Sequence, residues 1–232
     1  MLDIRNLDLH YGHSKILHDV SFAAETGAVT CLMGTNGVGK TSLLKAISGT
    51  HARSSGTLRV NGTDVPLNAK AHALAKLGVG YVPQGRDVFP LLTVQENLET
   101  GFACLPKGDH RVRDEIFELF PVLKEMQGRR GGDLSGGQQQ QLAIGRALVA
   151  KPKLLLLDEP TEGIQPNIIQ QIGRVISYLR DQGGIAILLV EQYFDFAFDL
   201  GDHFVTLTRG TVTHDAPRGE TDREGLLSKV SV

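Results

Sequence analysis

Apolar and polar residues follow two kinds of pattern along this chain. Leu2–Leu9 alternates apolar and polar residues, which predicts an edge or half-exposed strand. Val29–Met33, Leu154–Leu157 and Ile185–Val190 are short, almost wholly apolar runs, which predict buried strands. Further strands are expected at Val20–Ala24, Gly56–Val60, Val79–Val82, Phe204–Leu207 and Val212–His214, and helices at Thr41–Ile47, Ala69–Leu77, Gly137–Ala150 and Asn167–Arg180.

Strand and helix patterns alternate along most of the chain. Such alternation predicts an α/β sandwich with a largely parallel central sheet. The pattern changes between Phe89 and Met126, where apolar residues recur at helical spacing and Pro106-Lys107-Gly108 interrupts them. A glycine-rich stretch, Gly128–Gly132, follows. We therefore expect one domain over residues 1–232 with a mostly helical subdomain inserted at residues 88–133.

Composition and charge exclude several classes of protein for this chain. The 232 residues suit one large domain, and the formal net charge of −2 gives no global basic field for nucleic acid. No apolar run approaches the roughly 18 residues of a membrane span. The start Met1–Arg5 does not have the pattern of a signal peptide, so we expect a cytosolic protein. Cys31 and Cys104 are too few for a disulfide framework or a zinc site.

The most specific motif lies between the buried strand Val29–Met33 and the expected helix Thr41–Ile47. It has two glycines bracketing four residues, followed by Lys-Thr, which is the pattern of a phosphate-binding P-loop. Its glycines permit the turn that points backbone N–H groups at an anion, Lys40 places a charge on the phosphates, and the Thr41 hydroxyl suits Mg²⁺. The predicted nucleotide-binding residues are Gly34, Thr35, Asn36, Gly37, Val38, Gly39, Lys40 and Thr41.

Two carboxylates end the apolar run Leu154–Leu157. Ligands of open α/β sheets gather at the carboxyl ends of strands. Asp158 is suited to hold a magnesium ion, and Glu159 is suited to orient and deprotonate a water that attacks the γ-phosphate. Together with the P-loop, the pair predicts nucleotide hydrolysis.

A second candidate for an anion-binding helix start precedes the acidic pair by about 20 residues. Ser135, Gly136 and Gly137 open a helix that continues with Gln138–Gln141. Small residues at a helix start expose N–H groups and a serine hydroxyl to an anion. A plain glycine linker into a polar helix is the alternative for this segment taken alone.

The Ser-Gly-Gly-Gln segment resembles the signature motif of ABC-transporter ATPases, and the order and spacing of all three motifs extend the resemblance over the whole chain. The resemblance implies an ABC ATPase core with an N-terminal antiparallel β-subdomain. It implies that Ser135, Gly136, Gly137 and Gln138 contact ATP held by the P-loop of a partner copy. It also implies adenine stacking by Tyr11, an α-phosphate contact from Ser42, and a contact of Gln84 with Mg²⁺ and the attacking water.

Two positions depart from the usual pattern of that family. Gln192 stands where the family usually has a histidine, and it can donate a hydrogen bond but cannot carry a proton's charge. Glu162–Pro166 replaces a loop that usually resembles Ser-Ala-Leu-Asp. Both departures resemble the ATPase subunits of branched-chain amino acid and urea importers. Three segments look most like the urea subunit, so urea is the expected solute and branched-chain amino acids are the alternative. They are Gln84–Pro90, Gly132–Ser135 with the four glutamines Gln138–Gln141, and Glu162–Pro166.

The resemblance implies partners as well. They are integral-membrane permease subunits, a periplasmic solute-binding protein, and a second ATPase subunit that is a paralogue or an identical copy. The expected place of work is the cytoplasmic face of the inner membrane. Three alternatives remain at this point: a soluble ABC ATPase of DNA repair or the ribosome, a P-loop kinase, and a binding module without catalysis. The single cassette, the Ser-Gly-Gly segment and the intact Lys40, Asp158 and Glu159 argue against them in turn.

Overall fold

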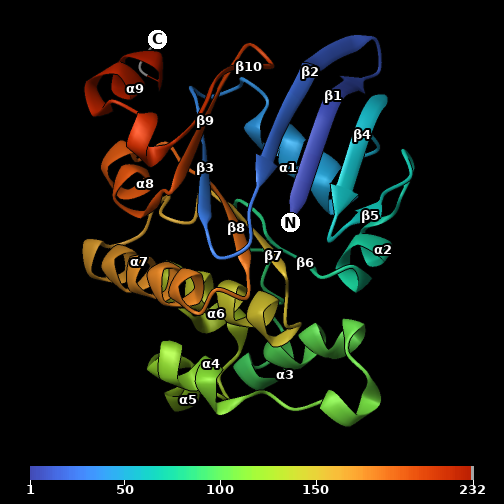
Figure 1. The fold of residues 1–232 in the computed structure, drawn as a ribbon. Helices are drawn as coiled ribbons and strands as arrows, with labels where there is room; N and C mark the ends of the chain where they lie inside the picture. Colours follow the sequence, from blue (N-terminus) through green and yellow to red (C-terminus); the bar gives the residue numbers. More distant parts are fainter. Residues whose placement is uncertain (231–232) are drawn as a thin grey trace.

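The computed structural model describes residues 1–230 and contains two β-sheets with helices packed between and beneath them (Figure 1). The strands are β1 (Leu2–Tyr11), β2 (Ser14–Ala24), β3 (Val29–Met33), β4 (Ser55–Val60), β5 (Thr63–Asp64), β6 (Val79–Val82), β7 (Leu154–Asp158), β8 (Ala186–Val190), β9 (His203–Thr208) and β10 (Thr211–Pro217). The α-helices are α1 (Lys40–Ser48), α2 (Ala71–Lys76), α3 (Val94–Glu99), α4 (Asp114–Leu119), α5 (Pro121–Glu125), α6 (Gly136–Val149), α7 (Pro166–Asp181), α8 (Phe194–Leu200) and α9 (Arg223–Val230).

The smaller sheet is antiparallel and has the order β2-β1-β4-β5. The pair Asn61-Gly62 joins β4 to β5, and both residues have positive φ, as a tight hairpin turn requires. The alternation seen in the sequence along β1 places Leu2, Ile4, Leu7 and Leu9 in the core. The expected antiparallel N-terminal sheet is therefore confirmed.

The larger sheet has the order β10-β9-β3-β8-β7-β6, in which β10 alone pairs antiparallel with its neighbour among the described strands. The largely parallel central sheet is confirmed. Parallel strands end at the same edge, so the residues after β3, β6, β7 and β8 meet there. This edge gathers the P-loop, Gln84, the acidic pair and Gln192, although Gly34 and Gln192 are about 160 residues apart in sequence.

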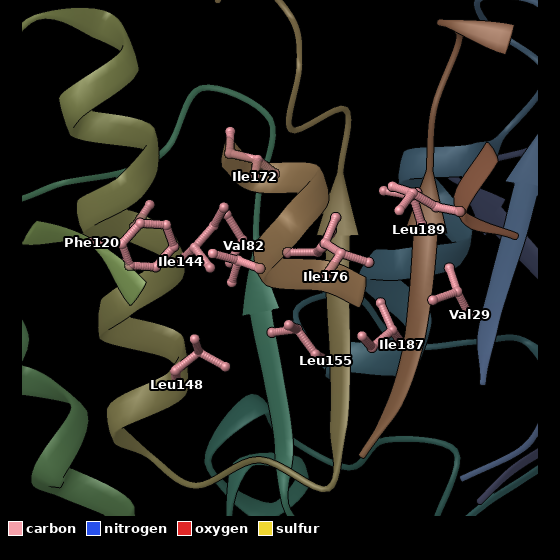
Figure 2. Packing of buried hydrophobic residues seen from close by; sticks show 14 of the residues in the cluster. Val29, Val82, Phe120, Ile144, Leu148, Leu155, Ile172, Ile176, Ile187 and Leu189 are labelled. Atoms are coloured by element: carbon pink, nitrogen blue, oxygen red, sulfur yellow. The ribbon is translucent and has the colours of Figure 1, made fainter. Parts of the chain in front are cut away.

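The two faces of the central sheet belong to different cores. Leu154 and Leu156 of β7 face a core shared with α1 and the antiparallel sheet. Leu155 and Leu157 face the other core, shared with α6 and α7. Figure 2 shows this second core, in which side chains of α6 and α7 lie against those of the strands. All four leucines are fully buried. Because successive side chains of a strand point to opposite faces of the sheet, β7 contributes to both cores.

The inserted region contains short helices, as its spacing predicts. Residues 88–133 include α3, α4 and α5, which Figure 1 shows on the far side of α6 from the central sheet. Thr93 caps α3 with a reciprocal pair of hydrogen bonds to Glu96, which stabilises a helix of only six residues. The boundaries 88 and 133 of the subdomain stay a prediction.

Two helices near the end of the chain are not among the predicted elements. The segment of α8 alternates aromatic and acidic residues, a pattern more typical of a strand, yet it packs against α7 and β3. The segment of α9 buries Leu226 alone among its eight residues, so it has little periodicity. Within residues 1–230, no helix combines the length and apolar character needed to cross a membrane.

Candidate nucleotide-binding and catalytic site

The P-loop connects the carboxyl end of β3 to the first turn of α1. Gly34 and Gly39 have φ values of 150° and 109°, which side chains rarely adopt. A methyl group built on Gly39 would lie 2.8 Å from Cδ2 of Leu17, and one on Gly34 would collide with the carbonyl oxygen of Leu207. The loop is therefore tightly wound against the sheets, and only glycine fits at these two positions.

Lys40 is the first residue of α1, and its side chain is 4% exposed. Its ammonium group donates hydrogen bonds to the carbonyl oxygens of Gly34 (2.8 Å) and Thr35 (2.9 Å). Burial lowers the pKa of Lys40, and the carboxylate of Glu159, 3.7 Å away, acts in the opposite direction. The ammonium charge therefore lies between the loop that would hold phosphates and the carboxylate expected to act on them.

Asp158 is the last residue of β7 and is almost fully buried. Its two oxygens accept hydrogen bonds from the hydroxyls of Thr41 (3.4 Å) and Tyr81 (3.3 Å). Burial raises the pKa of Asp158, and these two hydrogen bonds oppose that rise. Thr41 and Asp158, both predicted magnesium ligands, are thus close neighbours with oxygen atoms of the kind that Mg²⁺ prefers.

Glu159 lies just beyond the end of β7 with a φ of 49°, an uncommon conformation for a residue with a side chain. Its N–H donates to the carbonyl oxygen of Val190, which anchors it to the end of β8 (2.9 Å). One carboxylate oxygen accepts from Nε2 of Gln84 (3.2 Å) and the other from Nε2 of Gln192 (2.6 Å). The carboxylate is therefore held between two amides that come from different strand ends.

A cavity of about 300 Å³ opens beside these groups. Tyr11 lies at its edge, 41% exposed, with one ring face stacked on His51 at a centroid distance of 4.4 Å. Gly34 and Thr35 line a neighbouring cavity, together with Gln192. The first cavity is lined by Tyr11, Ile16, Asn36, Gly37, Gly39, Lys40, Thr41, Ser42, Gln84 and Glu159.

The arrangement fits a nucleotide with its phosphates on the P-loop. Gly37 and the N-terminus of α1 border the open space, and a methyl group on Gly37 would meet nothing within 4 Å. The backbone N–H groups of such a turn form an anion-binding cradle. The exposed ring of Tyr11 offers a flat apolar surface at the cavity's edge, as adenine stacking needs.

The second expected anion-binding element lies elsewhere. Ser135 caps α6: its hydroxyl accepts from the N–H of Gln138 (3.4 Å), and Oε1 of Gln138 accepts from the N–H of Ser135 (2.9 Å). These residues and Gly136 and Gly137 line a cavity of about 480 Å³ that shares no lining residue with the P-loop cavity. One chain thus carries two separate sites suited to anions.

Two carboxylates beside the site are absent from the predicted residues. Glu191 is 2% exposed and accepts hydrogen bonds from the N–H groups of Thr161 (3.0 Å), Gln192 (3.1 Å) and Tyr193 (3.3 Å). Burial raises the pKa of Glu191, and the hydrogen bonds from these N–H groups counteract it. Glu191 ends the apolar run Ile185–Val190 just as Asp158 ends the run of β7, so the same reasoning about strand ends could have found it.

Glu162 is the second of these carboxylates. Its Oε2 accepts a hydrogen bond from Nε2 of Gln84 (3.0 Å), the same amide nitrogen that contacts Glu159. Glu162 lies in the segment Glu162–Pro166, which departs from the family's usual sequence. That departure is the sequence feature that could have pointed to Glu162.

Comparisons with known proteins agree with this geometry. The family model of the ABC transporter matches residues 17–162. The high-affinity branched-chain amino acid transport ATP-binding protein BraG of Pseudomonas aeruginosa is 43% identical over 93% of this chain and 92% of its own. The branched-chain amino acid transport ATP-binding protein LivF, so named as probable, of Archaeoglobus fulgidus is 37% identical over 95% and 93%. A solved ATP-binding cassette of an ABC transporter in its ADP conformation matches with a TM-score of 0.84 and 27% identity over 100% of this chain and 96% of its own.

The chain belongs to the ABC transporter family, as one of its ATP-binding, ATP-hydrolysing cassettes. The predicted class, fold, enzymatic activity and nucleotide are confirmed. These two relatives are named as ATP-binding proteins of branched-chain amino acid transport, which supports the alternative solute better than the expected urea. The roles of the individual site residues stay predictions that rest on the geometry above.

Proposed function

We propose that this chain is the ATPase subunit of an importer of branched-chain amino acids, bound to permease subunits at the cytoplasmic face of the inner membrane. One observation carries the catalytic part of this proposal. The Glu159 carboxylate faces Lys40 across the P-loop cavity and accepts one amide hydrogen bond on each of its oxygens. This is the arrangement expected of a base that aligns a water in front of a bound phosphate.

The residues divide the work of hydrolysis as follows. The Lys40 ammonium exchanges its bonds with loop carbonyls for the β and γ oxygens of ATP. Glu159 accepts the proton of the attacking water, and the amides of Gln84 and Gln192 keep the carboxylate aimed. Thr41, Asp158 and Gln84 would hold Mg²⁺ through their oxygen atoms, and the ion would supply neutralisation of the charge on the phosphate oxygens. Catalysis by this site is mostly positioning and electrostatics.

Gln192 takes the position of the histidine usual in this family. Its amide is already bonded to Glu159, so it can orient the base and still turn a hydrogen bond toward the γ-phosphate. It cannot take up a proton, so Glu159 alone accepts the proton of the water in this proposal.

The two separate anion-binding elements support a sandwich of two cassettes. The P-loop of one copy and the Ser135-Gly136-Gly137 helix start of another would close over the same ATP, and closure would move the permease subunits. The partner cassette is a second copy of this chain or a paralogue. A periplasmic solute-binding protein would deliver the solute.

The choice of solute depends on similarity to the relatives, because an ATPase subunit of a transporter does not contact the transported solute. Identity to the branched-chain amino acid subunits supports leucine, isoleucine and valine. Urea is the second candidate, favoured by the segments Gln84–Pro90 and Glu162–Pro166. Uptake of labelled leucine and labelled urea by cells with and without this chain tests the choice. Loss of leucine uptake alone is expected; loss of urea uptake alone would assign the cassette to urea.

A further inference from the structure

The loop after Gln84 is fixed to the helix that starts at Ser135. Arg86 and Asp87 both have positive φ, 74° and 47°. Their carbonyl oxygens accept hydrogen bonds from the guanidinium of Arg146, at 3.3 Å and 2.8 Å. Arg146 belongs to α6, and Ser135 is the N-cap of the same helix. The backbone that carries Arg86 is therefore held in an uncommon conformation by the helix whose N-terminus is the second anion-binding element.

The side chain of Arg86 lies against the first residue of that helix. A methyl group built on Gly136 would lie 2.9 Å from Nη1 of Arg86 and 3.3 Å from its Cζ and Nη2. Nη2 also donates to the carbonyl oxygen of Glu162, over 3.4 Å. The guanidinium is thus placed over the helix start, and a side chain at position 136 would displace it.

This placement brings two positive groups together. The N-terminus of a helix carries a partial positive charge, so a cation beside it is unfavourable unless an anion lies nearby. Across residues 1–230 no carboxylate forms an ion pair with Arg86, and the Glu162 carboxylate accepts from Gln84 instead. The half-buried guanidinium keeps most of its donors for a ligand.

Arg146, which contacts the same loop from α6, shows how a structural arginine differs from Arg86. Its guanidinium is desolvated, which lowers its pKa, and both of its terminal nitrogens bond to backbone carbonyls. The guanidinium of Arg86 makes one long hydrogen bond in the part of the chain that the structure describes. A guanidinium with unused donors beside the first N–H groups of a helix matches a phosphate, which accepts several charge-assisted hydrogen bonds at once.

We propose that Arg86 binds the γ-phosphate of the ATP held by the P-loop of the partner cassette, together with Ser135 and the N–H groups of Gly136 and Gly137. This inference rests on the proposed sandwich and adds a charged residue to the surface that each copy presents to the other's nucleotide. Replacing Arg86 should therefore weaken ATP-driven closure of the dimer. It should leave the affinity of the separate monomer for nucleotide unchanged.

A first experiment measures ATP-driven dimerisation of the purified chain in the Glu159→Gln background, where hydrolysis does not reverse closure. Adding Arg86→Ala should raise the ATP concentration for half-maximal dimerisation about ten- to hundredfold, as expected for loss of a charge-assisted hydrogen bond. Arg86→Lys, which keeps the charge, should recover part of the loss. ATP and ADP affinity of the monomer and the thermal unfolding midpoint should not change.

Arg111→Ala is the matched control. Arg111 is 78% exposed and pairs with Asp114 at the surface, so this variant removes the same charge away from the site and should dimerise normally. An Arg86→Ala variant that dimerises at the same ATP concentration as Arg111→Ala would overturn the proposal. An equal loss in Arg86→Lys and Arg86→Ala, together with a lowered unfolding midpoint, would overturn it in favour of a structural role.

A second experiment tests whether Arg86 serves the opposite copy. Chains carrying Glu159→Gln and different fluorophores are mixed, one with Lys40→Ala and the other with Arg86→Ala. If Arg86 acts across the dimer, the Lys40→Ala P-loop of one chain faces the Arg86→Ala surface of the other, so both changes fall in one nucleotide site. The second site of the same dimer is then complete, and ATP should raise energy transfer between the two fluorophores. The reference is Lys40→Ala mixed with Ser135→Ala, and both mixtures should respond alike.

The outcomes separate the two proposals. No response with Arg86→Ala, while the reference mixture responds, would show that Arg86 does not act across the dimer. No response in the reference mixture, or no ATP-dependent dimer of the Glu159→Gln chain itself, would contradict a sandwich of two copies of this chain, on which the role of Arg86 rests.

Discussion

Gln192 donates a hydrogen bond from Nε2 to Oε1 of Glu159 over 2.6 Å, the shortest of the contacts described here around the acidic pair. The other oxygen of Glu159 accepts from Gln84 over 3.2 Å. Gln84 follows β6 and Gln192 follows β8, the two strands that flank β7 in the sheet. The carboxylate that follows β7 is therefore oriented by residues that follow both neighbouring strands.

Removing one of these amides should slow hydrolysis more than it weakens ATP binding. Gln192→Ala should lower kcat about 10²-fold, the usual effect of losing one preorganised donor, with a smaller change in KM. Gln192→His restores a donor at the same position and should recover most of the rate. Steady-state phosphate release measures both variants. An alanine variant with wild-type kcat would mean that Gln192 does not orient Glu159.

Replacing Glu191 should affect both the rate of ATP hydrolysis and the stability of the fold. It accepts three backbone hydrogen bonds, from the loops that follow β7 and β8, and so holds Thr161 and Gln192 in place. Glu191→Gln replaces one acceptor oxygen with a donor that would face an N–H group. We expect the free energy of unfolding to fall by about 1–3 kcal/mol and kcat to fall more than KM rises. Chemical denaturation and phosphate release check the two effects, and a fall in neither would contradict the role given to Glu191.

Tyr11 should affect nucleotide affinity through its ring alone. Tyr11→Ala removes the exposed aromatic surface and should weaken ATP binding roughly three- to tenfold, in line with about 0.5–1.5 kcal/mol for a stacked pair. Tyr11→Phe keeps the ring and should bind ATP normally, which makes it the control. Titration of each variant with a fluorescent ATP analogue measures the change. Equal affinity of the alanine and phenylalanine variants would place adenine elsewhere.

Asp8 should make the free energy of unfolding depend on pH in the acid range. Its carboxylate accepts from Lys15, from the N–H of Asp19 and from Ser55, and these contacts lower the pKa of Asp8 to about 2 from 3.8. Because the folded pKa is lower than the unfolded one, this stabilisation is complete above about pH 4 and is lost as the pH falls toward 2. Asp8→Asn should cost about 1 kcal/mol of unfolding free energy at pH 7 and about half of that at pH 3.

Denaturation of both proteins at the two pH values measures this difference. The sign follows from the direction of the shift: the unfolded chain takes up a proton at a higher pH than the folded one. A cost of Asp8→Asn that is the same at pH 7 and pH 3 would show that the ionised carboxylate does not stabilise the sheet.

The sequence predicts the parts of the site whose chemistry is local. The P-loop and the acidic pair are short segments, each attached to an apolar strand, so their motif and their place at a strand end are visible together. Gln84 and Gln192 lack such a local signal and could be predicted only from resemblance to the family. Their contact with Glu159 depends on the order of β6, β7 and β8 in the sheet.

Other features arise from packing between distant segments. Arg86 lies over Gly136, fifty residues away, and no pattern near either residue indicates the contact. The helices α8 and α9 carry weak or misleading periodicity, and tertiary contacts determine their structure. The solute is bound by other subunits, so its identity has no direct signal in this chain. Resemblance of a few short segments to the urea subunits proved weaker than similarity to the branched-chain amino acid relatives over the whole chain.

The central claim is that Glu159 activates the water that attacks ATP bound between two cassettes. Glu159→Gln keeps the size and the hydrogen-bonding reach of the side chain but removes its ability to take a proton. Phosphate release and light scattering on the purified variant test the claim together. The account predicts normal ATP affinity, a stable ATP-bound dimer and a turnover rate lower by about 10²-fold or more. Hydrolysis at the wild-type rate would contradict it.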